Sequence, residues 1–295
     1  IYTPTHTLSL HDALPILVFR CNSFGEKAFL LSRVGDDELG HEALDRLEEL
    51  GISVMDVQID SEFPTGTVQI DFDEKKESIY TVKPDVAFDH IEFSTEALKL
   101  ARNADCLFYG LLPQRYGISK NTIRELIKES PRSLKFFDLK LFQHFFNAGV
   151  VDSLLKSSHI VRIKEKEIDF LAEKLKFPAG EAEDFGRLLV EKYKVDLVII
   201  TRGHNGVFAF HKEKGPFSDS GYQVKIKDNI GSGMAFSAGF LHYFLNGSPL
   251  QDALNFGNAA GALNTTKLGA TTFFNKKDVL KFMKRTRKNN SSTSL

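Results

Sequence analysis

Several residue types are scarce in this chain of 295 residues, and their scarcity excludes whole classes of protein. There is no tryptophan, and the two cysteines, Cys21 and Cys106, have neither metal-site nor redox-pair spacing. This cysteine usage predicts a reducing compartment, and we expect a cytoplasmic protein. No run approaches the roughly 18 apolar residues that span a bilayer, and the net charge is only −1. We therefore expect neither a membrane nor nucleic acid among its partners.

Common catalytic motifs are missing as well. The pattern G-x-x-x-x-G-K-[ST] is absent, which excludes a Walker loop. The pattern G-x-S-x-G is also absent, so a hydrolase would have no nucleophile elbow. Five histidines lack the spacing and the cysteine partners of a metal site, and we interpret them as surface or hydrogen-bonded residues. They are His41, His90, His144, His159 and His204.

The remaining composition is that of an ordinary globular protein. Hydrophobic residues make up 42% of the chain and charged residues 26%. This length and composition allow a full core in one α/β domain or in two small ones. Phenylalanine is abundant, with 26 residues, which predicts a phenylalanine-rich core.

The first sixteen residues differ from the rest of the chain. Residues 1–16 resemble a translated sequencing adapter with a short index inside it. A signal peptide is the competing interpretation, but no basic region opens the segment and His11-Asp12 interrupts any apolar stretch. We therefore exclude residues 1–16 from the predicted fold and expect the native start of the protein to be missing.

A glycine-containing turn before a helix is the most informative stretch. In Asp228–Phe236, Gly231 and Gly233 flank Ser232, and apolar residues recur at helical spacing as far as Asn246-Gly247. Unpaired amides and the helix dipole make such a turn an anion site. A glycine-rich connection without a ligand is the alternative. The third glycine of the dinucleotide fingerprint is absent.

Strand patterns alternate with helix patterns through the middle of the chain. Four short buried strands are predicted at 105–110, 133–138, 159–163 and 196–201. Such alternation predicts a mostly parallel sheet that helices cover on both faces. Ligands of these sheets bind at the carboxyl ends of the strands. Asp138, Thr201 and the Gly231 turn all fall at such ends, which predicts a single site.

The flanking regions give further expected elements. We predict a strand at 27–32, a helix at 38–50 and a hairpin formed by 64–72 and 78–82, with its turn at 73–76. A helix capped by Ser248 is expected to run to about Thr265. The basic and serine-rich tail, 281–295, is expected to fray.

The glycine turn resembles the second signature of the ribokinase-like (PfkB) sugar kinases, D-T-x-G-A-G-D-x-F. Seven of the nine positions match in kind, and the exceptions are Asn229 for Thr and Met234 for the second Asp. Val34–Gly40 and Pro64–Thr67 resemble the fructokinase branch of this family. The resemblance covers nearly all of residues 17–275.

The resemblance implies a fold and a set of partners. The expected fold is a ribokinase-like three-layer α/β sandwich over residues 17–280, with a mostly parallel central sheet and a small β-lid at about 62–83. In the family this lid covers the sugar and forms dimer contacts, which implies a possible homodimer. An edge hairpin without a lid role is the alternative.

The nucleotide half of the family pattern is preserved. Thr201, Gly203 and Gly206 match the T-x-G-x-x-G turn that contacts ATP, and Asn258 matches the helix that lines the adenine. Asp228 and Ile230 match the loop for a monovalent cation, which would be K⁺. The alternative for the 201–206 turn is an ordinary turn at the end of a strand, and the alternative for Asn258 is a polar residue on a helix face.

The chemical half departs from the pattern. Gly231, Ser232 and Gly233 keep the anion hole, but Met234 stands at the position of the general base. Asp138 and Lys140 remain on the substrate side, where D-x-N-x-R has become Asp138–Phe142. Lys164 and Glu167 stand where the family has N-x-x-E near Mg²⁺ and the phosphates. The family's sugar-binding Asp and its G-G-x-x-x-N element are not present.

The resemblance therefore implies ATP- and Mg²⁺-dependent phosphoryl transfer to a sugar hydroxyl, fructokinase-like and weakened or lost in this chain. The alternative is a non-catalytic nucleotide-binding pseudokinase or regulatory protein. A truncated or error-bearing gene copy is a third interpretation. No residue pattern identifies the sugar.

Overall fold

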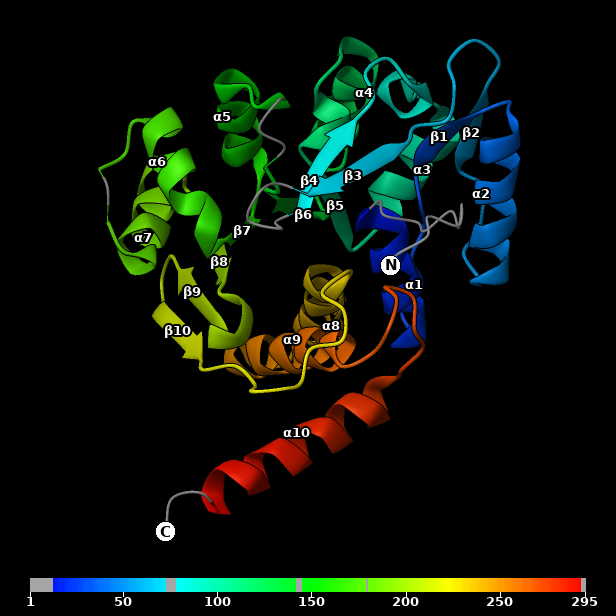
Figure 1. The fold of residues 1–295 in the computed structure, drawn as a ribbon. Coiled ribbons are helices and arrows are strands. Elements are labelled where there is room, and N and C mark those ends of the chain that lie inside the picture. Colours follow the sequence, from blue (N-terminus) through cyan, green and yellow to red (C-terminus); the bar gives the residue numbers. More distant parts are fainter. Residues whose placement is uncertain (1–12, 73–77, 142–144, 179, 293–295) are drawn as a thin grey trace.

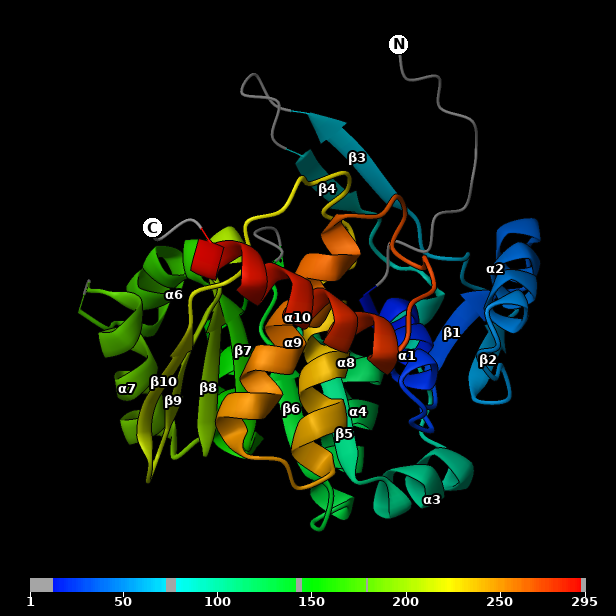
Figure 2. The ribbon, with the colours of Figure 1, turned by 90° about the horizontal axis from the view of Figure 1, so that it is seen from below.

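A six-stranded sheet with helices on both faces forms the centre of the molecule (Figures 1 and 2). The computed structural model describes residues 13–72, 78–141, 145–178 and 180–292. Within these residues no helix is both long and apolar enough to cross a membrane. The predicted hairpin turn at 73–76, together with His144 and Phe142, lies outside the described residues.

The sheet has the order β10-β9-β8-β7-β6-β5. Its four parallel strands are β5 (Cys106–Gly110), β6 (Leu134–Asp138), β7 (Ile160–Lys164) and β8 (Leu197–Thr201). Two antiparallel strands, β9 (Val207–His211) and β10 (Gly215–Asp219), complete one edge. The prediction of a mostly parallel sheet in a ribokinase-like α/β fold is confirmed. The β8 run Leu-Val-Ile-Ile is almost fully buried, as expected of a strand covered on both faces.

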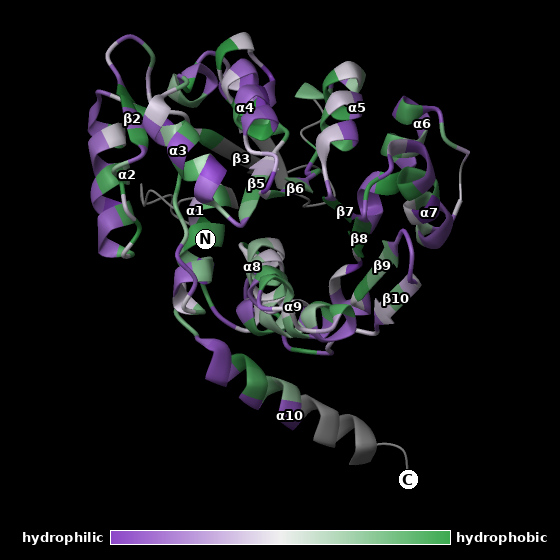
Figure 3. Ribbon diagram, turned by 180° about the vertical axis from the view of Figure 1, so that it is seen from behind, coloured by the Kyte–Doolittle hydropathy of each residue, from purple (hydrophilic) through white to green (hydrophobic). Residues whose placement is uncertain are grey.

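Two groups of helices cover the two faces of the sheet (Figure 1). One face carries α4 (Gly117–Glu129), α5 (Ala148–Ser157), α6 (Ile168–Leu175) and α7 (Ala182–Tyr193). The other carries α1 (Ala13–Ser23), α8 (Ser232–Leu245) and α9 (Leu250–Thr265). Figure 3 shows that β8 and β9 are hydrophobic, whereas α2 (Glu38–Glu49) contains both hydrophobic and hydrophilic residues. The predicted phenylalanine-rich core is present, since five Phe side chains are at most 1% exposed. They are Phe136, Phe137, Phe240, Phe256 and Phe274.

Helices α8 and α9 pack closely because glycines lie between them. A Cβ on Gly257 would come within 2.9 Å of the Phe236 carbonyl oxygen, and one on Gly261 within 3.1 Å of the Ser232 carbonyl oxygen. A larger residue at either position would push the helices apart. These contacts set the position of the first turn of α8 against α9, and therefore the position of the glycine turn before it.

The N-terminal third adds a smaller unit. Strand β1 (Ser32–Gly35) pairs in parallel with β2 (Val57–Asp60), and α3 (Thr95–Asn103) follows the hairpin. The hairpin itself is confirmed: β3 (Val68–Phe72) pairs with β4 (Ser78–Val82) in antiparallel register. It lies over the end of the sheet where α8 begins (Figure 2).

The strand predicted at 27–32 is wrong. The strand begins at Ser32 instead, because β2 offers hydrogen-bonding partners only from Val57 onwards, opposite Ser32. Leu30 is 3% exposed and packs with Val18 and Leu47, so its apolar character reflects packing against helices. The apolar residues at 27–31 therefore resemble a strand in sequence because they are packed against helices, although they form no strand.

Three helices begin or end at residues other than those expected from the sequence. Helix α9 begins at Leu250 with Pro249 as its N-cap, so Ser248 does not cap it. Helix α10 spans Lys276–Ser292, which includes most of the tail expected to fray. Helix α1 begins at Ala13, and Ile16, from the excluded segment, is only 2% exposed. The origin of residues 1–16 stays a prediction.

Asp37 joins the start of α2 to the loop before the hairpin. Its Oδ1 accepts hydrogen bonds from the Gly40 amide at 2.7 Å and from the Thr65 hydroxyl at 2.6 Å, and its Oδ2 accepts one from the Thr65 amide at 2.8 Å. Burial alone would raise the pKa of the Asp37 carboxyl, but the bonds from Thr65 and Gly40 hold that pKa below its usual value. The carboxylate is therefore the form that stabilises the fold.

We expect the Asp37→Ala change to lower the free energy of unfolding by about 1–2 kcal/mol at neutral pH, because it removes an N-cap. A carboxyl with a lowered pKa contributes stability above its unfolded-state pKa of about 4, and that contribution is lost as pH falls through the folded-state pKa. Urea unfolding at neutral and at acidic pH measures both effects. The Asp45→Ala variant, also on α2 but exposed, is the control. An equal loss in both variants would contradict the prediction.

Candidate functional site

The carboxyl ends of three parallel strands bring the predicted site residues to one edge of the sheet. Asp138 ends β6, Lys164 ends β7 and Thr201 ends β8. In the strand register Asp138 lies beside Arg162, and Lys164 lies beside Thr201. The glycine turn reaches the same edge, since the Nη1 atom of Arg162 donates to the Gly233 carbonyl oxygen at 3.1 Å.

Arg162, which was not among the predicted site residues, is the central residue of this edge. Its Nε and Nη2 atoms donate to the two carboxylate oxygens of Asp138 at 2.9 and 2.8 Å. Both side chains are buried, at 2% and 6% exposed. A two-pronged guanidinium–carboxylate pair fixes both groups in orientation. The available signal was a cation inside the apolar strand pattern Ile-Val-Arg-Ile.

The glycine turn has three open amides, that is, backbone N–H groups without a hydrogen-bond acceptor among the described residues. Gly231 is the N-cap of α8 with φ of 78°, a conformation that favours glycine. The Asp228 carboxylate accepts the Ile230 amide at 2.9 Å, whereas the amides of Gly231, Gly233 and Met234 donate to no acceptor among the described residues. A Cβ on Gly233 would come within 2.6 Å of Arg162. Open amides at a helix N-terminus beside a cation can bind a phosphate.

Met234 lies behind the turn in an apolar environment. Its side chain is 5% exposed and belongs to the cluster that includes Ile16, Leu17 and Phe256. A thioether in such surroundings cannot accept a proton from a hydroxyl group. The position that carries the general base in the resembling family therefore contributes packing here.

Lys164, which is half-buried, and Glu167, which is buried, lie close to the Arg162–Asp138 pair. Glu167 closes the short helix η4 (Glu165–Glu167), and its oxygens accept the Leu141 and Lys164 amides, both at 3.1 Å. Burial raises the pKa of Glu167 and lowers that of Lys164, and each charge partly offsets the shift of the other. The charge of Lys140 lowers the pKa of Lys164 further, which places Lys140 in the same group.

A second group of predicted residues surrounds the end of β10. The turn after β8 contains η5 (Gly203–Asn205) and Gly206, which has φ of 88°. A Cβ on Gly206 would collide with the Asp219 carbonyl oxygen. Asn258 on α9 is 7% exposed and donates from Nδ2 to the Asp219 carboxylate. Asp219, which was not among the predicted site residues, therefore joins the turn after Thr201 to α9.

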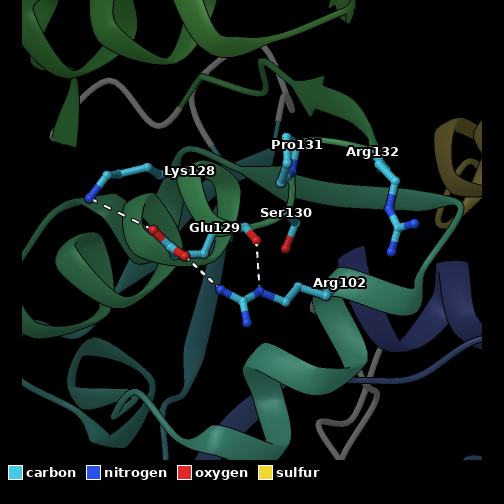
Figure 4. Close-up of a pocket in the computed structure, with 6 residues that line it drawn as sticks. All are labelled: Arg102, Lys128, Glu129, Ser130, Pro131 and Arg132. Atoms are coloured by element: carbon cyan, nitrogen blue, oxygen red, sulfur yellow. Dashed lines mark hydrogen bonds and ion pairs between the residues drawn. The ribbon is translucent and has the colours of Figure 1, made fainter.

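One surface cavity lies away from this edge (Figure 4). This pocket, of about 330 Å³, opens between the end of α4 and the start of β6, and its lining residues are Arg102, Lys128, Glu129, Ser130, Pro131 and Arg132. None of them belongs to the predicted site. Arg102 donates to the Glu129 carboxylate at 2.7 Å and to the Glu129 carbonyl oxygen at 3.0 Å. The pocket contains neither the buried charges nor the open amides of the sheet edge.

Metal binding by clustered side chains is not evident in the part of the chain that the structure describes. No group of three or more His, Cys, Asp or Glu side chains there could hold a metal ion.

Comparison with known proteins gives consistent matches. The model of the pfkB family of carbohydrate kinases matches residues 20–277. Fructokinase-2 of Oryza sativa subsp. japonica is 28% identical over 267 residues, which are 83% of this chain and 76% of the relative.

Two solved structures share the fold. A fructokinase from Xylella fastidiosa with bound ATP has a TM-score of 0.81 at 18% identity and covers 93% of this chain and 90% of its own. A fructokinase double mutant from Vibrio cholerae, with fructose, ADP and potassium ion bound, has a TM-score of 0.78 at 21% identity and covers 92% and 90%.

Proposed function

Because this chain belongs to the pfkB family of carbohydrate kinases, we propose that it binds ATP with Mg²⁺ at the carboxyl edge of the central sheet and descends from a fructokinase-like enzyme. That enzyme's reaction is phosphoryl transfer from ATP to a sugar hydroxyl. The observation that supports this most directly is the set of open amides at Gly231, Gly233 and Met234 beside the buried Arg162.

Each part of the edge has a role in this proposal. The open amides and Ser232 hold the transferring phosphoryl group, since fixed donors stabilise charge that develops in the transition state. Thr201, Gly203 and Gly206 contact the nucleotide phosphates, and Asn258 lies by the adenine. Lys164 adds positive charge next to the phosphates. Asp138 and Lys140 lie on the substrate side.

Mg²⁺ neutralises phosphate charge when it is bound. Glu167 is the residue that suits it, although both its oxygens already accept backbone amides, so contact through water is expected. The loop that contains Asp228 and Ile230 is proposed to bind a monovalent cation. The Asp228 carboxylate oxygens accept hydrogen bonds from the Ile230 and Gly269 backbone amides, and the Ile230 carbonyl oxygen accepts one from the Asn264 side chain.

The proposed reaction lacks a general base at position 234. A general base contributes about 10²–10⁴-fold in rate, or roughly 3–5.5 kcal/mol of barrier. Met234 supplies none, so we propose impaired transfer. A nucleotide-binding pseudokinase is the second candidate, and the combination of a preserved nucleotide half with a buried Met234 favours it.

Assembly and location remain predictions. The β3–β4 hairpin is proposed as a lid over the sugar and as a surface for a homodimer. Both cysteines are free, and Cys21 is buried, where burial raises the pKa of its thiol to about 12. Burial raises the pKa of the Cys106 thiol as well, so neither cysteine is shifted toward the reactive thiolate form. The proposal of a reducing, cytoplasmic compartment rests on the presence of only two cysteines without redox spacing.

Thermal unfolding with ATP and Mg²⁺ tests nucleotide binding. A ligand at about 100 times its Kd stabilises the folded state by about 2.7 kcal/mol, which raises Tm by about 5 °C for a chain of this size. We expect this shift in the native protein and none in Gly206→Ala, because a Cβ there displaces the turn from Asp219. The exposed Arg187→Ala variant is the control. No shift of the native protein at millimolar ATP would remove both candidate functions.

A further inference from the structure

A buried guanidinium lies behind the glycine turn. Arg20, on α1, is 0% exposed, and within the described residues it forms no ion pair with a carboxylate. Its Nη atoms donate to three oxygens: the Thr272 carbonyl at 2.9 Å, the Phe274 carbonyl at 3.2 Å and the Asn264 side-chain carbonyl at 3.2 Å. The guanidinium also lies over the Phe274 ring, 3.5 Å from its centroid.

The partners of Arg20 lead directly to the turn. Asn264, on α9, is 1% exposed and donates from Nδ2 to the Ile230 carbonyl oxygen at 2.8 Å. Ile230 immediately precedes Gly231, the N-cap of α8. Thr272 and Phe274 lie on the connection between α9 and α10, which is also tied to the turn through the bond from the Gly269 amide to Asp228 at 3.0 Å.

The charge of Arg20 needs an explanation. A buried cation without a counter-ion is strongly unfavourable unless oxygens replace its hydration. Here three neutral carbonyl oxygens do so for the two Nη atoms, whereas the buried Nε has no partner among the described residues. Such a set of oxygens also suits a monovalent metal ion. Burial lowers the pKa of Arg20 to about 9, so the side chain remains mostly charged near neutral pH.

We propose that Arg20 is a positioning residue whose guanidinium takes the place of a monovalent cation behind the glycine turn and, through Asn264, holds Ile230 so that the open amides face the phosphate. This inference rests on the proposed function for its effect on ATP binding. Its effect on the turn itself does not depend on a nucleotide. The consequence is that ATP binding by this chain requires no added K⁺.

The first measurement is amide hydrogen exchange without nucleotide. In Arg20→Ala we expect the two hydrogen-bonded amides of the turn, those of Ile230 and Ser232, to exchange about tenfold faster than in the native protein. Adding guanidinium or potassium chloride should restore slow exchange, and adding tetramethylammonium chloride should not. Arg20→Met, which fills the space without charge, should exchange as fast and not recover. Arg20→Lys should stay close to native. Amides of β8 report global stability and should change little.

The second measurement is ATP–Mg²⁺ affinity at equal ionic strength in potassium and in tetramethylammonium chloride. We expect the native Kd to agree within about twofold between the two salts, and the Arg20→Ala Kd to be about tenfold weaker in tetramethylammonium only. Native binding that requires K⁺ would overturn the proposal and support a metal cation at Asp228 and Ile230.

The outcomes separate the two proposals. Native-like exchange of the turn in both Arg20→Ala and Arg20→Met would also overturn the role of Arg20, whatever the nucleotide result. If the native protein binds no ATP–Mg²⁺ in either salt, the proposed function fails, while the exchange measurement still decides whether Arg20 holds the turn.

Discussion

Replacing Arg162 with methionine should lower the free energy of unfolding by about 3–5 kcal/mol, because it leaves the Asp138 carboxylate buried without its partner. The pair is almost fully buried, and the guanidinium reaches both carboxylate oxygens and the Gly233 carbonyl oxygen. The same change should weaken ATP–Mg²⁺ binding, since the glycine turn loses its contact with β7. Urea unfolding measures the first effect and thermal shift the second.

Two further variants give the Arg162 experiment its control. Arg162→Met combined with Asp138→Leu should recover most of the stability, because replacing both members of a buried ion pair removes the uncompensated charge. Arg187→Met, which breaks an exposed pair with Asp184, should change stability by about 1 kcal/mol or less. If Arg162→Met lost no more than that, the buried pair would not hold this edge together.

Replacing Met234 with aspartate should raise sugar-dependent ADP release by about 10²-fold or more, because it restores a proton acceptor beside the open amides. Met234 is the third residue of α8, where a negative charge is favourable next to the helix dipole. The apolar cluster around it, which includes Ile16 and Leu17, opposes the change and should reduce stability. A coupled assay over a panel of sugars measures the rate.

Met234→Asn is the matched variant, since asparagine has the shape of aspartate but cannot act as a base. It should lose a similar amount of stability and gain no activity. Equal rates in the two variants would show that a missing base does not limit the reaction. The absent sugar-binding Asp and G-G-x-x-x-N element would then be the next explanation.

The sequence predicts the carboxyl edge of the central sheet correctly where the strands can be recognised from neighbouring residues alone. The mostly apolar segments before Asp138 and Thr201 specify buried parallel strands, and the carboxyl ends of these strands must share one edge. The prediction failed at residues 27–31, where apolar residues pack against helices. It also missed Arg162, Asp219 and Asn264, because their partners are distant in the sequence.

By itself, the sequence determined the alternation of strands and helices, the hairpin, and the glycines that open the turn before α8, since each depends on neighbouring residues and backbone freedom. Only the tertiary structure decided which charges meet. Arg162 finds Asp138 and Gly233, and Arg20 reaches Ile230 through Asn264, across more than 200 residues. A buried charge is stable only where the whole fold supplies its partners, so local pattern cannot assign them.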